Sequence, residues 1–330
     1  MSSVKVAFVA SGGAARGLAH LGVLKACEEL GLVPEIFVGT SSGALVGAMY
    51  GQDVPLDVML DGYRLPWRRR HQGPRLHMST FLGMPTPEEL LDFGHLTSGL
   101  FSIRRLEVYL RRHLPINDFR QLPKPVYVTA VDIDSGERAV FGPGSNEAVP
   151  VSEAVAASCC VPGLFRPIEV GGRFYVDGEV ARTLSADIAV EAGADVVIIS
   201  NIYRPQRDRG SKRSLAQKGM HRVLRQSLST LLTEKERRGV EVLAHRYPHV
   251  TFIDIAPDLG PYGYLNRFSA RPVVLRGYGT ALRALASAKA DGVFDRVLPR
   301  ASDVSLPGAD DGAADVSGSL ATRPGLRIVG

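Results

Sequence analysis

The sequence predicts an α/β fold built on parallel strands, and three observations favour this class. Residues 4–10 (VKVAFVA) are apolar and rich in β-branched residues, as expected of a strand covered on both faces. A glycine-rich loop and a helical pattern follow, and the same order of strand, tight loop and helix repeats from residue 35. Successive units of this kind require crossover helices between parallel strands. The length of 330 residues and the hydrophobic content of 45% suffice for a well-buried core.

The first two units are defined by their turn residues. The first helix is expected over residues 18–31, where leucines fall on one face and a glycine followed by Pro34 ends the pattern. The second strand is expected at 35–39. The tight turn TSSG then leads into a second helix over 44–51.

The remaining elements follow from periodicity and breaker residues. Proline and glycine interrupt residues 52–122, which predicts a cap inserted over the sheet. The further expected elements are a hairpin turning at 134–136, a short helix from residue 151 that ends before Pro162, a hairpin turning at 171–172, a helix and strand over 185–200, a helix over 213–245 within a basic amphipathic segment (204–245), and a strand at 249–255. One folded domain is thus expected over 1–300, and the aperiodic residues 301–330 are expected to be a disordered acidic tail.

Basic residues gather in two windows, although the whole chain carries only +5. Residues 62–87 hold five arginines and no acid, and residues 204–225 hold eight Lys and Arg against one Asp. Such windows are either solvated loops or contacts with an anionic surface. Nucleic acid is not an expected partner, because no nucleic-acid-binding motif is present and few aromatics interleave with the arginines.

The compartment is predicted from features near the N-terminus and from the cysteines. The first apolar run has no basic leader, and no apolar stretch reaches the roughly 18 residues of a membrane span. The chain has three cysteines, and the neighbours Cys159 and Cys160 would form only a strained disulfide. A reducing cytoplasm is the simplest interpretation.

The stretch Gly39-Thr40-Ser41-Ser42-Gly43 satisfies G-x-S-x-G between an expected strand and an expected helix. A sharp strand-to-helix turn requires Gly39 and Gly43, because a side chain there would clash with the neighbouring element. The turn would present Ser41 above the carboxyl ends of the strands, at the positive end of the helix dipole. An ordinary turn with a serine N-cap remains the alternative.

A second loop, Gly12-Gly13-Ala14-Ala15-Arg16-Gly17, also joins an expected strand to an expected helix. Its small residues leave backbone N–H groups free to face an anion, and Arg16 adds positive charge. Either a nucleotide phosphate or an oxyanion that develops when Ser41 attacks a carbonyl fits such a loop, and a plain tight turn is the alternative without a ligand. The glycine spacing is poor for a dinucleotide fingerprint.

A serine nucleophile needs a base, and the sequence offers two kinds. A Ser-Asp-His order is satisfied by His245 or His249, but one lies on a charged helix and the other opens a strand. Asp177 is the better candidate, because it ends an extended segment and the following Gly178 allows the backbone to turn. An ordinary Asp-Gly turn is the alternative.

Three blocks together resemble the patatin-like phospholipase family: the loop at 12–17, the motif at 39–43, and AASCCVPGLFRPIEVGGRFYVDGE at 156–179. The resemblance covers residues 4–203. It implies a three-layer α/β/α sandwich, a Ser41–Asp177 dyad without histidine, and an oxyanion hole made by the first loop with Arg16. Two residues depart from the family pattern: Ala14 replaces a glycine, and Glu179 follows the Asp-Gly pair where glycine or alanine is usual. A second carboxylate near Asp177 is expected to raise the proton affinity of the pair.

The expected function is hydrolysis of phospholipid or lysophospholipid esters through an acyl-serine, with no metal or cofactor required. The oxyanion would be held by the N–H groups of Gly12, Gly13 and Ala14, joined by that of Ser42. The alternatives are an esterase, thioesterase or acyltransferase on small acyl donors, a non-catalytic lipid-binding protein, and, more distantly, a nucleotide-binding protein. The two basic windows would contact anionic headgroups, with four membrane-facing candidates: Trp67, Arg68, Arg69 and Arg70.

Overall fold

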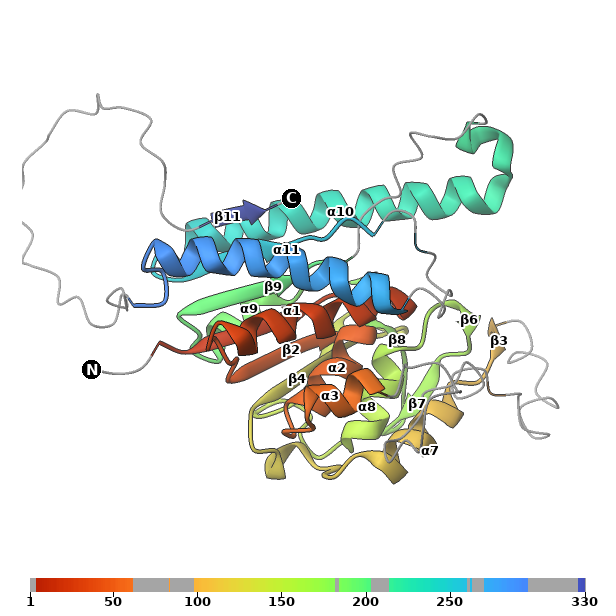
Figure 1. The fold of residues 1–330 in the computed structure, drawn as a ribbon. Helices are drawn as coiled ribbons and strands as arrows, with labels where there is room; N and C mark the ends of the chain where they lie inside the picture. Colours follow the sequence, from red (N-terminus) through yellow and green to blue (C-terminus); the bar gives the residue numbers. More distant parts are fainter. Residues whose placement is uncertain are drawn as a thin grey trace, which may run out of the picture.

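The computed structural model describes residues 4–61, 83, 98–181, 184–202, 214–259, 262, 270–295 and 326–329. Within this part of the chain, one large sheet has the strand order β11-β10-β9-β1-β2-β4-β8-β7, and β5 also pairs with β4 (Figure 1). Its strands are β1 (Val6–Ala10), β2 (Ile36–Thr40), β4 (Val126–Asp132), β5 (Arg138–Phe141), β7 (Ile168–Val170), β8 (Arg173–Asp177), β9 (Val196–Ser200), β10 (Thr251–Ile255) and β11 (Leu326–Val329).

Strands β11 to β4 along this order are parallel, whereas β5, β7 and β8 pair in antiparallel fashion. The predicted α/β class with a mainly parallel sheet is therefore confirmed. Both predicted hairpins are also present, as β4–β5 and β7–β8.

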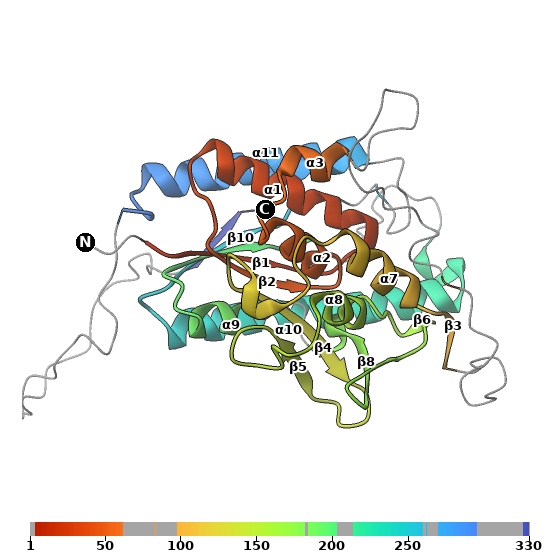
Figure 2. The same cartoon turned by 90° about the horizontal axis from the view of Figure 1, so that it is seen from below.

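Helices cover both faces of the sheet (Figure 2). One face carries α1 (Leu18–Glu29), α2 (Ser42–Tyr50), α3 (Leu56–Asp61) and α11 (Ala270–Ala290), and the other carries α9 (Ala186–Glu191) and α10 (Met220–Arg246). The alternation of side chains along a strand divides the core in two: Phe8 of β1 packs on the first face, while Ala7 and Val9 pack on the second. This is the three-layer arrangement that the resemblance implies.

Helix α11 is not among the elements expected from the sequence. It packs against α1 through two glycines that allow the backbones to approach closely. A Cβ atom at Gly22 would lie 2.1 Å from the carbonyl oxygen of Val274, and one at Gly277 would lie 2.2 Å from that of Ala19. The contact buries Val273, Ala281 and Leu285 of α11 in the core.

The C-terminal segment and the expected cap remain to be compared with the sequence-based expectations. Strand β11 pairs in parallel with β10, so the predicted disordered tail over 301–330 is wrong for residues 326–329. In the expected cap, the described residues form α3, α7 (Arg104–His113) and the strand β3 (Gly99–Phe101), which pairs with β6 (Gly163–Phe165) in a separate small sheet. The rest of the cap lies outside the described residues, and its placement over the sheet stays a prediction. None of the helices in the described ranges combines the length and apolarity that crossing a bilayer requires.

Candidate active site

The strand register brings the two candidate catalytic residues to the same edge of the sheet. Ser41 directly follows β2, and Asp177 is the last residue of β8. On the strand between them, Thr129 pairs with Thr40 and Ala130 pairs with Asp177. The two side chains thus meet across β4, although 136 positions separate them in the sequence.

Ser41 lies in a strained turn whose glycines are required by their neighbours. Its backbone has φ 53° and ψ −118°, a conformation that is costly for a residue with a side chain. The Ser41 N–H donates to Ser158 Oγ at 2.7 Å, which helps to hold the turn. A Cβ atom at Gly39 would lie 2.5 Å from the Gly43 backbone, and one at Gly43 would lie 2.3 Å from the Ala10 carbonyl oxygen. The predicted need for glycine at both positions is confirmed.

Asp177 is buried against Ser41 and is held by three hydrogen bonds. Its side chain accepts from the Ser41 hydroxyl. Its Oδ1 also accepts from the Glu179 N–H at 3.0 Å, and its own N–H donates to the Cys160 carbonyl at 2.9 Å. Burial raises the pKa of Asp177 to about 7, while the two hydrogen bonds to its carboxylate act in the opposite direction. Burial is therefore the main cause of the raised pKa of Asp177, and not the second carboxylate, Glu179, that was expected to raise it.

The glycine-rich loop follows β1, the strand beside β2 in the sheet. Ala14 has φ 48°, in the left-handed region that glycine favours. The loop thus keeps the backbone conformation of a glycine at this position, although alanine replaces the glycine usual in the family. The Arg16 side chain is 2% exposed, and its Nε donates to the Tyr262 carbonyl oxygen at 2.8 Å. This bond ties the loop to the segment before α11.

Glu179 makes a contact that the sequence analysis does not predict. Its Oε1 accepts a hydrogen bond from the backbone N–H of Gly12, the first residue of the glycine-rich loop. The carboxylate lies so close that a Cβ atom at Gly12 would fall 2.7 Å from that oxygen. The only signal in the sequence is the departure from the family pattern, which indicates an unusual residue but not its partner.

Cys159 is a second neighbour of Ser41, and no sequence motif indicates this contact. Its side chain is hydrogen-bonded to that of Ser41, and burial raises the pKa of the thiol well above its ordinary value. The nearby Asp177 charge acts in the same direction. Cys159 therefore stays protonated at neutral pH and is a neutral, polarisable neighbour of the serine rather than a competing thiolate.

The two histidines considered as partners of Ser41 lie away from it. His245 is near the end of α10 and His249 precedes β10, so both lie at the amino edge of the parallel sheet, opposite Ser41. His20 is fully buried in α1, bonded to Ser200 Oγ at 2.7 Å and to the Ser11 carbonyl at 2.8 Å, and burial lowers its pKa to about 4. The topology thus does not bring the histidines considered for a Ser-Asp-His arrangement to the serine.

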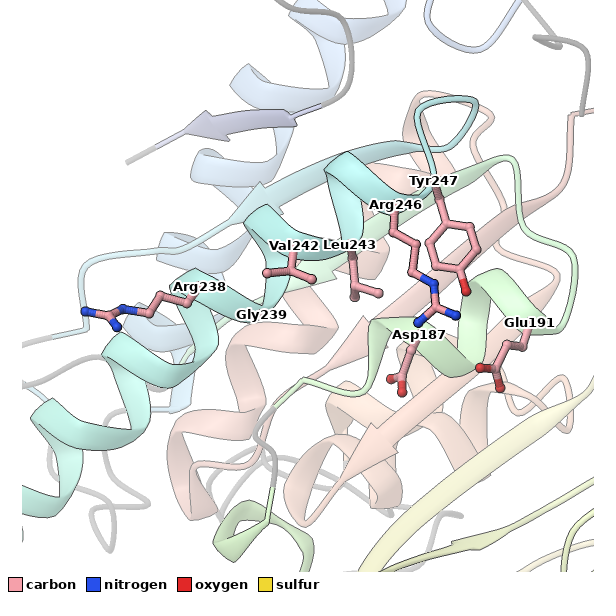
Figure 3. A pocket seen from close by; sticks show the side chains of 8 residues that line it. All are labelled: Asp187, Glu191, Arg238, Gly239, Val242, Leu243, Arg246 and Tyr247. Atoms are coloured by element: carbon pink, nitrogen blue, oxygen red, sulfur yellow. The ribbon is translucent and has the colours of Figure 1, made fainter. Parts of the chain in front are cut away.

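A pocket of about 320 Å³ lies between α9 and α10, away from Ser41 (Figure 3). Leu243 and Val242 of α10 supply apolar lining, and Arg246 extends toward the acidic side chains of α9. One of these acids, Asp187, is already held by Arg138 through two bonds of 2.9 and 3.0 Å. The pocket belongs to the packing between the two helices and holds none of the candidate catalytic residues.

The remaining candidates are not placed. Trp67, Arg68, Arg69 and Arg70 lie outside the described residues, as do the rest of the first basic window apart from residue 83 and residues 204–213 of the second. Their contact with a membrane stays a prediction.

Among known protein families, the model described as Patatin-like phospholipase matches residues 8–190 of this chain. An uncharacterized NTE family protein of Mycobacterium tuberculosis is 29% identical over 197 residues, covering 60% of this chain and 49% of that protein. The human patatin-like phospholipase domain-containing protein 6 is 29% identical over 199 residues, covering 60% of this chain and 13% of that protein. The chain thus spans about half the length of its mycobacterial relative, or less in the human case.

Among solved structures, VipD from Legionella pneumophila has a TM-score of 0.46 at 13% identity, covering 87% of this chain and 67% of that one. The type III effector protein ExoU has a TM-score of 0.33 at 15% identity, covering 86% of this chain and 53% of that one.

Proposed function

The chain belongs to the patatin-like phospholipase family, and from this premise we propose that it hydrolyses carboxylic esters of phospholipids or lysophospholipids. One observation carries the proposal beyond the family name. The hydroxyl of Ser41, on a strained turn, is hydrogen-bonded to the buried carboxylate of Asp177 at the carboxyl edge of the sheet. A loop with backbone N–H groups of the kind that bind anions follows the adjacent strand.

The proposed reaction uses Asp177 as the only base. The Ser41 oxygen attacks the ester carbonyl carbon while its proton passes to Asp177, and the carbonyl oxygen becomes an oxyanion. The backbone N–H groups of Gly12, Gly13 and Ala14, with that of Ser42, stabilise this oxyanion. A single donor of this kind is worth about 2.7–4 kcal/mol in the transition state.

The intermediate then collapses with cleavage of the ester C–O bond, and the leaving alcohol takes the proton from Asp177. Water attacks the acyl-serine and gives a proton to the same carboxylate. The second collapse releases the fatty acid and returns the proton to the Ser41 oxygen. A base with a pKa near 7 is suited to both steps at neutral pH, because it accepts and releases the proton readily.

Covalent labelling of the wild-type protein tests this function. A fluorophosphonate should add one phosphonyl group at Ser41, detected by intact mass and located by peptide mapping. Fatty acid should be released from phosphatidylcholine or lysophosphatidylcholine, and p-nitrophenyl esters of rising chain length should be turned over. A preference for short, monomeric esters would favour the esterase, thioesterase or acyltransferase alternative. A folded protein that neither labels nor turns over any ester would favour the non-catalytic lipid-binding protein.

We also propose that α10 contacts an anionic membrane surface with its N-terminal half. At 1.5 Å per residue, its 27 residues extend about 40 Å, whereas β9 and β10, which it connects, have five residues each. Because both strands are parallel to β1, α10 begins at the same edge as Ser41 and extends beyond it (Figure 1). Its exposed apolar side chains there include Met220 (78%), Leu224 (54%) and Leu231 (66%). Met220 and Leu224 lie within the basic window 204–225 and Leu231 follows it, a composition typical of interfacial helices.

Vesicle sedimentation over a salt series checks this contact. Binding should require anionic lipid and should weaken as salt screens the basic window. The double variant Met220→Ser, Leu224→Ser should bind roughly tenfold or more weakly, because burying one such side chain is worth about 1.5–3 kcal/mol. The control Val33→Ser removes an exposed apolar residue that precedes β2, at the opposite edge, and should bind as the wild type does. Binding that is indifferent to salt, to anionic lipid and to the double variant would contradict the proposal.

A further inference from the structure

Glu179 connects the two halves of the candidate active site. It lies in the short 3-10 turn Gly178–Val180 immediately after β8. Its backbone N–H donates to the carboxylate of Asp177, and its side-chain Oε1 accepts from the backbone N–H of Gly12. One residue thus contacts both the proposed base and the loop proposed to stabilise the oxyanion.

The Glu179 side chain packs closely against Gly12. A Cβ atom added to Gly12 would lie 2.7 Å from Oε1, 2.8 Å from Cγ and 2.9 Å from Cδ of Glu179. A side chain at position 12 would therefore force the Glu179 carboxylate to move. The neighbouring Ser41 is only 7% exposed, so the serine is largely covered in this arrangement.

A carboxylate oxygen and a tetrahedral oxyanion make the same demand on a backbone N–H. Both are anionic acceptors, and hydrogen bonds to anionic acceptors are stronger than those between neutral groups. The single hydrogen of the Gly12 amide cannot serve both acceptors at full strength. The carboxylate also places negative charge where the reaction would develop it, which opposes the transition state.

We propose that Glu179 acts as a built-in occupant of the oxyanion site, which an ester substrate must displace from the Gly12 amide before Ser41 reacts. This proposal rests on the proposed function. It makes Glu179 a residue that restrains the rate through Gly12, not a catalytic residue. Loss of one oxyanion donor lowers kcat about 10²–10³-fold in serine hydrolases, so release of this donor should have an effect of up to that size.

Two variants distinguish the effect of occupying the Gly12 amide from the effect of the negative charge of Glu179. Glu179→Ala vacates the amide and should raise kcat/KM for p-nitrophenyl butyrate at least about tenfold, with a parallel rise in the second-order rate of fluorophosphonate labelling. Glu179→Gln has the same shape and can still accept the hydrogen bond, but as a neutral group, so it should give a smaller rise. The control Glu169→Ala removes an exposed carboxylate from β7, the strand paired with β8, and should leave both rates unchanged.

NMR tests the contact between Glu179 and the Gly12 amide independently of turnover. The backbone amide proton of Gly12, followed by NMR in selectively labelled protein, should shift upfield in Glu179→Ala because a strong hydrogen bond to a carboxylate is lost. It should shift less in Glu179→Gln. The Glu169→Ala protein should show the wild-type position.

The outcomes distinguish this proposal from the proposed function. If the wild type is labelled but Glu179→Ala is labelled no faster, or more slowly, the proposed restraint is wrong. The restraint is also wrong if the Gly12 amide proton does not shift in Glu179→Ala. If the amide moves but neither wild type nor Glu179→Ala labels or turns over an ester, the carboxylate–amide contact is real and the hydrolase function is wrong. Faster labelling together with a shifted amide supports both proposals.

Discussion

Replacement of Ser41 by alanine should abolish fluorophosphonate labelling and lower kcat/KM for ester substrates by roughly 10⁴-fold or more. Alanine removes the oxygen that forms the acyl bond, so any residual rate must come from water attacking an ester bound near the loop. The backbone of the turn should remain, because it is held by the Ser158 bond and by the close packing of Gly39 and Gly43. The loss should therefore appear in kcat, with substrate binding little changed.

The matched control is Ser135→Ala, an exposed serine in the β4–β5 turn. This variant should label and turn over esters at the wild-type rate. Circular dichroism and thermal unfolding would show whether Ser41→Ala keeps its fold. Undiminished labelling of a folded Ser41→Ala protein would mean that another side chain reacts, and the proposed nucleophile would be wrong.

The turn around Ser41 was predictable from sequence because its requirements are local. G-x-S-x-G between a strand and a helix specifies a sharp turn, and the clashes at Gly39 and Gly43 confirm the reason for both glycines. The edge of the sheet that carries Ser41 follows from the parallel order of the first two units. A site that depends on the local backbone conformation, such as this turn, can thus be predicted from a single sequence.

Contacts between distant segments were not predictable in the same way. Glu179 and Gly12 are 167 positions apart, and whether a side chain in a short turn points to the loop or to solvent depends on the register of β8 with β4. Helix α11 was missed because its packing against α1 uses small residues such as Gly277 rather than a strong apolar stripe. Strand β11 was missed because 70 residues, which include α11 and the aperiodic stretch after residue 300, separate it from its partner β10.

Replacement of Asp177 by asparagine should lower kcat/KM roughly 10³–10⁴-fold, because an amide cannot accept the serine proton. In the wild type, kcat/KM should rise with pH and level off above about 7, since only the ionised carboxylate acts as base. The variant should lose this rise. Asp134→Asn, an exposed residue of the β4–β5 turn, should keep both the activity and the pH profile of the wild type.

The same substitution should stabilise the fold at alkaline pH. The pKa of Asp177 is about 7 in the folded protein against an ordinary value of 3.8, so between these pH values the folded state binds a proton that the unfolded state has lost. The free energy of unfolding of the wild type therefore falls as pH rises from about 4 to about 7. At 1.36 kcal/mol per pH unit, the shift of about three units amounts to at most ~4 kcal/mol, which asparagine avoids. Urea unfolding at pH 4, 6 and 8 should show an advantage of the variant that grows across this range and is nearly absent at pH 4. An Asp177→Asn protein that is inactive and also less stable than the wild type at pH 8 would contradict a carboxylate that burial holds at a raised pKa.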